Sequence, residues 1–261
     1  MCLIFFAIRH HPDYPLIIAA NRDEFHARKT QAASFWQESN GILAGKDLEA
    51  CDMVNGCGTW LGIHRNGRLA LITNYRDPKN IDPKAPSRGH LVSNFLKGEM
   101  APEVYLNQLQ ARAHHFNGFN LVVGTVDDLF YFSNYREGVS RLLPGVYGLS
   151  NHLLDTPWPK VKNGKHEFEK IISRPFSDND LFQFLRNENR ASDQHLPDTG
   201  IGLERERALS AMFIKTPNYG TRCSTVIRID KMNKVSFSER VYDLQTFDHQ
   251  TQTFDFTLHT S

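Results

Sequence analysis

The residues of this chain best suited to chemistry are a cysteine at position 2 and the charged run Asn21-Arg22-Asp23-Glu24. Cysteine is small enough for the initiator methionine before it to be removed, and Cys2 would then carry a thiol and a free α-amino group. An α-amine has a pKa of ~7.7–8.0, so much of it is neutral at physiological pH and can accept the thiol proton. We expect the Asp23 carboxylate to hold that amine in place.

Two apolar runs predict how these residues meet. Residues 2–8 are continuously apolar, which is typical of a strand buried on both faces, and residues 15–20 form a second such run. The short polar stretch between them contains a proline, so the two runs are predicted to pair as an antiparallel hairpin. With the turn centred in that stretch, Cys2 lies opposite Asn21, and Asp23 lies just beyond.

Each of these residues also has an ordinary structural interpretation. Free cysteine is among the most buried residue types, so Cys2 taken alone is better explained as a small hydrophobe at the start of a core strand. An acid such as Asp23 is common at strand ends and turns. The predicted proximity of the two residues favours the chemical interpretation without excluding the structural one.

The composition limits the class of protein. The chain has 261 residues, of which 40% are hydrophobic, so it can bury a substantial core without disulfides or metals. The formal net charge is +1, and no basic run interleaved with aromatic residues occurs, so nucleic-acid binding is not expected. We predict a single domain spanning residues 1–261.

The four cysteines indicate neither a zinc site nor a redox motif. They form no Cys-x-x-Cys pair; they are Cys2, Cys51, Cys57 and Cys223. Cys51 and Cys57 are close enough in sequence to bridge, but we expect free thiols in a reducing compartment. The chain has no charged leader and no apolar segment of ~18 residues, so we expect a cytoplasmic protein without a transmembrane segment. No metal and no cofactor are expected.

The remaining elements are predicted from periodicity and turn residues. Asn66-Gly67 predicts a type I′ hairpin turn, because both residues tolerate positive φ. Strands gather at both ends of the chain with helices between them, which favours a mixed domain with largely antiparallel sheets. The loop-like stretch 187–202 is a candidate mobile flap. The predicted strands are 59–64, 69–74, 119–125, 129–133, 146–150, 224–230, 234–241 and 253–258; the predicted helices are 90–96, 101–113, 158–173, 178–186 (with Asp178 as a candidate cap) and 203–214.

Three polar residues next to predicted strands could complete a site around Cys2. Asn74 and Asn151 each lie at a strand end, where a side-chain amide could donate to the oxyanion of an acyl-transfer intermediate. Arg222 directly precedes a strand, and a guanidinium near a thiol lowers its pKa. The alternatives are routine turn-forming asparagines and a surface ion pair.

Several short motifs together resemble the NRDE family, also called the transport-and-Golgi-organisation (Tango) type. Besides Cys2 and the run at 21–24, the matching segments are Gly58-Thr59-Trp60-Leu61-Gly62, Thr73-Asn74-Tyr75-Arg76, Ser87-Arg88-Gly89, Leu149-Ser150-Asn151, Leu196-Pro197-Asp198-Thr199-Gly200 and Thr221-Arg222. That family is similar to N-terminal nucleophile (Ntn) hydrolases, in particular to the branch of bile-salt hydrolases and penicillin V acylases. The implied fold is α+β: a four-layer αββα sandwich of two antiparallel sheets. This chain has Ala20 where the hydrolase branch usually has Arg.

The resemblance implies two functions. The first is a cysteine hydrolase or acyltransferase acting on a small amide or thioester after Met1 removal; the second is a non-catalytic protein that binds or traffics haem, lipid or acyl-CoA. The partner would be a small molecule: an amide, a thioester, acyl-CoA or haem. The implied catalytic residues are Cys2, Asp23, Asn74, Asn151 and Arg222, and the implied substrate-binding residues are Asn21 and Arg22.

Overall fold

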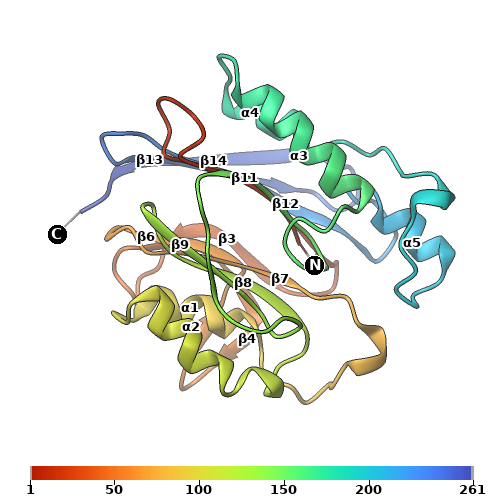
Figure 1. Cartoon of the computed structure of the whole chain (residues 1–261), viewed down its shortest axis with the longest axis horizontal. Helices are drawn as coiled ribbons and strands as arrows, with labels where there is room; N and C mark the ends of the chain where they lie inside the picture. Colours follow the sequence, from red (N-terminus) through yellow and green to blue (C-terminus); the bar gives the residue numbers. More distant parts are fainter. Residues whose placement is uncertain (1, 260–261) are drawn as a thin grey trace.

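Two antiparallel sheets pack face to face, with helices on both outer faces (Figure 1). The structure is a computed structural model and describes residues 2–259. The α+β, four-layer αββα prediction is confirmed. The first sheet has the strand order β11 (Gly145–Leu149), β1 (Cys2–Ile8), β2 (Leu16–Phe25), β12 (Tyr219–Ile229), β13 (Lys234–Tyr242) and β14 (His249–Thr257).

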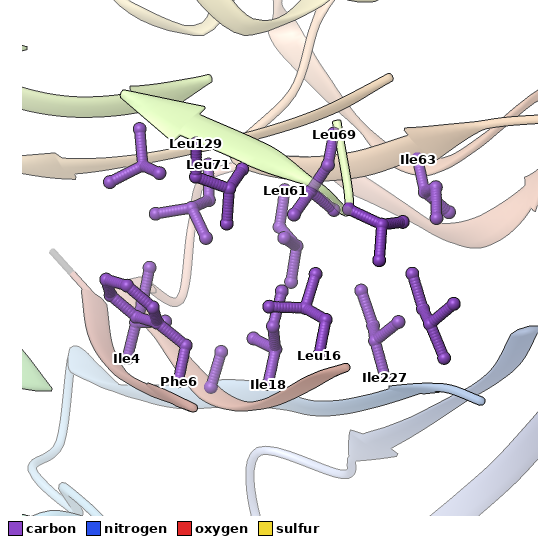
Figure 2. Packing of buried hydrophobic residues seen from close by; sticks show 14 of the residues in the cluster. Ile4, Phe6, Leu16, Ile18, Leu61, Ile63, Leu69, Leu71, Leu129 and Ile227 are labelled. Atoms are coloured by element: carbon purple, nitrogen blue, oxygen red, sulfur yellow. The ribbon is translucent and has the colours of Figure 1, made fainter. Parts of the chain in front are cut away.

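The second sheet comes mostly from the first half of the chain. Its strand order is β10 (Ser140–Arg141), β9 (Asp128–Ser133), β8 (Phe119–Thr125), β7 (Leu69–Asn74), β6 (Leu61–His64), β4 (Ile42–Asp52) and β3 (Thr30–Phe35), with β5 (Gly56–Gly58) paired to β4. The core between the sheets consists of aliphatic side chains from both. Figure 2 shows Ile4, Phe6 and Ile18 of the first sheet facing Leu61, Leu69 and Leu71 of the second.

Helices cover the outer face of each sheet. The second sheet packs against α1 (Gly89–Lys97) and α2 (Pro102–Gln110), and the first packs against α3 (Pro159–Ile172) and α4 (Asp178–Leu185). A fifth helix, α5 (Leu203–Leu209), follows a long loop, and short 3₁₀ turns lie at Pro78–Asn80, Ala113–His115 and Asp193–His195. No helix among residues 2–259 is long and apolar enough to cross a membrane.

The N-terminal hairpin forms, but its register differs by one residue from the prediction. Cys2 pairs with Arg22 and not with Asn21. The cause is the turn: the ladder closes at Ile8 and Leu16, so the loop between them contains an odd number of residues. Because side chains alternate across a strand, this shift places Cys2 and Arg22 on the same face.

That face looks toward the other sheet. Cys2 belongs to the cluster between the two sheets, whereas its neighbour Leu3 packs on the helical side. Asn21 and Asp23 alternate with Arg22 and therefore lie on the helical face of β2. The nucleophile candidate and the carboxylate thus reach the same end of the sheet from opposite faces.

Two local predictions are wrong in detail. Only Gly67 of the Asn66-Gly67 pair has a positive φ (87°), and the His64 amide bonds to the Arg68 carbonyl at 2.8 Å, so the turn is longer than a two-residue type I′ turn. Asp178 does not cap α4: the cap is Ser177. Its hydroxyl accepts from the amide three residues on, in a capping box that satisfies two otherwise unpaired backbone donors.

The expectation of free thiols at Cys51 and Cys57 is also wrong. The two residues are joined by a disulfide, because they face each other on the paired strands β4 and β5. The short turn between them brings the sulfurs together, a local geometry that the argument from cellular compartment did not include. Cys2 and Cys223 are free and buried.

Candidate active site

Strand pairing sets a row of three residues across one end of the first sheet. Cys2 at the start of β1 pairs with Arg22 of β2, and Arg22 pairs in turn with Cys223 of β12. On the other side of β1, Ile4 pairs with Leu149 of β11. β11 ends at Leu149, and Asn151 follows two residues later, at the same end of the sheet as Cys2. Segments from four distant parts of the chain therefore meet at Cys2.

The Cys2 thiol is buried, with 7% of the residue exposed. Burial raises the pKa of this thiol above its usual value, and the positive charge of Arg22 opposes the rise without overcoming it. The Arg22 guanidinium lies 4.3 Å from the centre of the Trp60 ring and 3.8 Å from carboxylate oxygens of Glu24 and Asp47. These contacts link the two sheets beside Cys2.

Asp23 is fully enclosed on the helical face of β2, with 1% exposed. Its Oδ1 accepts a hydrogen bond of 2.7 Å from the Thr221 hydroxyl on β12. Burial raises the pKa of the Asp23 carboxyl, while the positive charge of Lys160 lowers it. This lysine of α3 was not identified from the sequence as a charge that acts on Asp23.

Asn74 and Asn151 are brought together at the ends of β7 and β11. The Asn151 side-chain nitrogen donates to the Asn74 carbonyl at 3.1 Å, and the Arg76 amide donates to the Asn151 carbonyl at 2.8 Å. The Thr73 hydroxyl donates to the Ser150 carbonyl at 2.6 Å. These bonds join the second sheet to the first beside the row that contains Cys2.

Asn21 is engaged by the scaffold. Its side-chain nitrogen donates to the carbonyls of Leu185 and Met212, both at 2.8 Å, and its oxygen accepts from the Ser224 hydroxyl at 2.5 Å. These bonds anchor the end of α4 and the segment after α5 to β2. The structure therefore places Asn21 in a structural contact on the helical face, away from the face that carries the Cys2 side chain.

Arg222 lies at a bulge in β12 and holds the turn that follows β2. One terminal nitrogen, Nη1, donates to the carbonyls of Phe25, His26 and Arg28 at 2.8–3.0 Å, and the other, Nη2, donates to the Thr30 hydroxyl at 3.3 Å. Arg22 carries a guanidinium whose charge lowers the pKa of the Cys2 thiol, and Arg222 is not among the main causes of the shift in that pKa. The structure thus brings Cys2, Asp23, Asn74 and Asn151 to one end of the sheets, with Arg222 in the adjoining turn.

A group of buried charged and polar side chains, missed by the sequence analysis, lies behind Asp23. We call it the polar cluster; it consists of Arg76, Lys160, Glu206 and Tyr219. The Arg76 Nη1 is 2.7 Å from the Glu206 Oε2, and both side chains are more than nine-tenths buried. Lys160 donates from Nζ to the Leu209 carbonyl at 2.9 Å, and burial lowers its pKa to about 8.

One sequence signal could have indicated part of this cluster. Arg76 closes the Thr73–Arg76 motif, and the amide and hydroxyl of Thr199, in the Leu196–Gly200 motif, both donate to the Glu206 Oε1. Lys160 and Tyr219 have no local signature, because only the tertiary packing makes them neighbours of Asp23.

Two cavities adjoin the polar cluster. The larger, about 540 Å³, lies between α3 and the loop after α4, and its lining includes Lys160, Asn187 and His195. The smaller is lined by Arg76, Trp158, Lys160 and Glu206, among others, so Lys160 belongs to both. Cys2 lines neither cavity. Among residues 2–259, no group of three or more histidine, cysteine or acidic side chains could hold a metal ion.

Comparisons with known proteins agree along nearly the whole chain. A family model described as Transport and Golgi organisation 2 matches residues 1–244. The Transport and Golgi organization protein 2 homolog of Homo sapiens is 38% identical, with 99% of each chain covered, and Transport and Golgi organization protein 2 of Drosophila melanogaster is 32% identical, with 92% of this chain and 91% of that protein covered. A mutant of the conjugated bile acid hydrolase from Clostridium perfringens superposes with a TM-score of 0.49 at 8% identity, covering 100% of this chain and 98% of that one.

Proposed function

The chain belongs to the Transport and Golgi organisation 2 family, and on this premise we propose that it is a cysteine hydrolase or acyltransferase. Its substrate is a small amide or thioester, and its nucleophile is Cys2 after removal of Met1. The main support is the pairing of Cys2 with Arg22, with Asp23 one residue further along β2 and Asn151 two residues beyond the end of β11. A thiol, a buried carboxylate and side-chain amides at one sheet end are the groups that acyl transfer from an N-terminal nucleophile requires.

The reaction follows from these groups. The Cys2 sulfur attacks the substrate carbonyl carbon, and the α-amine of the same residue takes the thiol proton. The carbonyl oxygen becomes an oxyanion that side-chain amides of Asn74 and Asn151 stabilise. Collapse of this intermediate breaks the bond to the leaving amine or thiol, which takes the proton from the α-amine. Water, or another acceptor, then attacks the acyl-cysteine thioester and releases Cys2.

The α-amine is needed because the surroundings of Cys2 do not by themselves favour a thiolate. Burial raises the pKa of the thiol, so a base must remove its proton at the moment of attack. While Met1 is attached, the nitrogen of Cys2 is a peptide nitrogen and cannot accept a proton. Removal of Met1 is therefore the step that supplies the base, and in this mechanism Asp23 holds it.

A second candidate is a non-catalytic protein that binds and traffics haem, lipid or acyl-CoA. The observation that favours it is the burial of the Cys2 thiol together with a large cavity that Cys2 does not line. In this reading the cavity between α3 and the loop after α4 receives the ligand. Ligand affinity would then not depend on the Cys2 thiol or on removal of Met1.

Intact mass and covalent labelling separate the two candidates. For the hydrolase, the mature protein lacks Met1, and a thiol-acylating β-lactone probe labels it at Cys2. Cys2→Ala should abolish labelling, whereas Cys223→Ala, which removes the other free buried thiol, should leave it unchanged. Retention of Met1, or equal labelling of the Cys2→Ala protein, would refute the hydrolase. Saturable binding of haem or palmitoyl-CoA that is identical in Cys2→Ala would support the second candidate.

A further inference from the structure

One edge of a buried guanidinium in the polar cluster has hydrogen-bond donors without acceptors. The Arg76 side chain is 94% buried, yet its Nε and Nη2 have no hydrogen-bond partner among residues 2–259. Buried donors are almost always paired, and leaving one unpaired costs roughly 1–3 kcal/mol. An unpaired pair of donors on one side chain therefore points to an acceptor that comes from outside the chain.

Glu206 cannot supply that acceptor as the side chains are arranged. It contacts the opposite end of the guanidinium, at Nη1, through its Oε2. Its other oxygen, Oε1, accepts from both the amide and the hydroxyl of Thr199. Both carboxylate oxygens of Glu206 are thus engaged, and the Nε–Nη2 edge of Arg76 stays open.

The open edge has the geometry that recognises an oxyanion. Nε–H and one Nη2–H point in parallel, and this planar fork matches two oxygens of a carboxylate or a phosphate. The guanidinium lies 4.9 Å from the centre of the Trp158 ring, so an aromatic face fixes its plane. Arg76, Trp158 and Lys160 all line the smaller cavity, so a second cation is close to the same space.

A further unpaired donor lies nearby. The Tyr219 hydroxyl is buried without a hydrogen-bond partner among residues 2–259. Tyr219 lies two residues before Thr221 on β12, and the Thr221 hydroxyl donates to Asp23. Because side chains alternate along a strand, Tyr219 lies on the same face of the sheet as Asp23.

The space available sets the size of the group. The smaller cavity is about 10 Å³, which is room for roughly one water-sized atom, such as a single oxygen of the anion. The larger cavity of about 540 Å³ shares Pro159, Lys160 and Ser210 with it. A ligand could thus place an anionic end against Arg76 and extend its body along α3.

We propose that Arg76, with Tyr219 and Lys160, forms a subsite for a carboxylate or phosphate group on the substrate. The subsite rests on the proposed function in one respect: its ligand is taken to be the substrate of the proposed enzyme. The anion would occupy the Nε–Nη2 edge of Arg76, whose backbone amide donates to the carbonyl of Asn151. The substrate class is then an anionic amide or thioester, not a neutral one.

Binding is tested on the Cys2→Ala protein, so that catalysis plays no part. Glutarate, inorganic phosphate and neutral glutaramide are titrated by calorimetry. We expect saturable one-site binding of one anion and none of glutaramide; the anion that binds identifies the group as carboxylate or phosphate. Absence of saturable binding for both anions, which would mean that ordered waters alone satisfy Arg76, would overturn the subsite.

Two substitutions locate the binding. Arg76→Lys keeps a positive charge beside Glu206 but removes the two-donor edge, so affinity should fall roughly 10- to 100-fold. Tyr219→Phe removes only a hydroxyl and should weaken binding by roughly 10-fold. Arg141→Lys, on an exposed ion pair with Asp128, is the matched control. Unchanged affinity in Arg76→Lys would place the anion elsewhere.

Acylation of processed protein separates this inference from the proposed function. Phenyl thioesters of glutaric acid, of 3-phosphonopropionic acid and of neutral pentanoic acid are compared by the rate at which intact mass reports acyl-Cys2. Faster acylation by an anionic thioester that Arg76→Lys abolishes supports both proposals. Equal rates for all three thioesters overturn the subsite but keep the hydrolase. Anion binding without any acylation keeps the subsite and argues against the hydrolase.

Discussion

Lys160 gives a test of the polar cluster that requires no substrate. Its ammonium is buried within α3, only 6% exposed, and burial lowers its pKa from the ordinary 10.5 to about 8. Between these two values the unfolded chain holds a proton that the folded chain has lost. Because the unfolded chain binds more protons than the folded chain here, the free energy of unfolding should rise with pH in this range.

The size of the effect follows from the two pKa values. Burial of Lys160 lowers the free energy of unfolding by about 3 kcal/mol at pH 7, where the residue is charged in the fold, and by less than about 1 kcal/mol at pH 10, where it is neutral in the fold. In Lys160→Met this term is absent. The free energy of unfolding of the wild type should therefore increase by about 2.5 kcal/mol relative to the variant between pH 7 and pH 10.

Urea unfolding followed by tryptophan fluorescence at pH 7, 8, 9 and 10 measures this difference. Any packing change caused by the substitution alters the free energy of unfolding of the variant by the same amount at every pH. The test is therefore how the difference in free energy of unfolding between wild type and variant changes with pH. Lys231→Met removes a lysine charge at the exposed turn between β12 and β13 and controls for net charge. A difference that stays flat, or that moves in favour of the variant as pH rises, would show that Lys160 is not a buried cation.

Three further predictions concern the disulfide, the helical core and the carboxylate. Replacing both Cys51 and Cys57 by serine should lower the free energy of unfolding by about 2 kcal/mol, because the bond closes a short loop; an unchanged urea midpoint under non-reducing conditions would contradict this. Phe168→Ala, at a fully buried position, should cost about 3–5 kcal/mol in the same assay, whereas Phe25→Ala, at a 61% exposed one, should cost under about 1 kcal/mol. Asp23→Asn should reduce β-lactone labelling of the processed protein by at least about 100-fold with the fold intact by circular dichroism; full labelling would remove Asp23 from the mechanism.

Local pattern was enough to predict most elements of the fold. The apolar run at 2–8 alternates between two cores, one toward the second sheet and one toward α3 and α4, and a strand buried on both faces needs apolar residues at every position. The helix predicted at 158–173 forms as α3, from Pro159 to Ile172. The helix predicted at 203–214 ends early, at Leu209, because the Phe213 amide bonds to the Asn187 carbonyl and the segment joins the core.

The position of the candidate site was predicted, but its register was not. The hairpin rule brought Cys2 and the Asn21–Glu24 run to the same sheet end, as the structure has them. The pairing shifted by one residue because the length of the loop was set by backbone bonding at the turn, such as the Arg9 amide to the Pro15 carbonyl. Side chains alternate between the two faces of a strand, so a shift of one residue in the pairing of β1 with β2 changes which residues share a face.

The sequence by itself determined most of the strands (not β3, β4, β5 and β10), the placement of Cys2 at the head of one of them, and the pairing of that strand with the one that carries Asp23. These depend on neighbours along the chain, whose spacing and polarity are visible in the sequence. Only the tertiary structure decided that Lys160 acts on Asp23, and that Arg76 pairs with Glu206 across 130 residues of sequence. The physical reason is that a buried charge is tolerated only where distant segments pack around it and supply its partners, and that packing leaves no local signature.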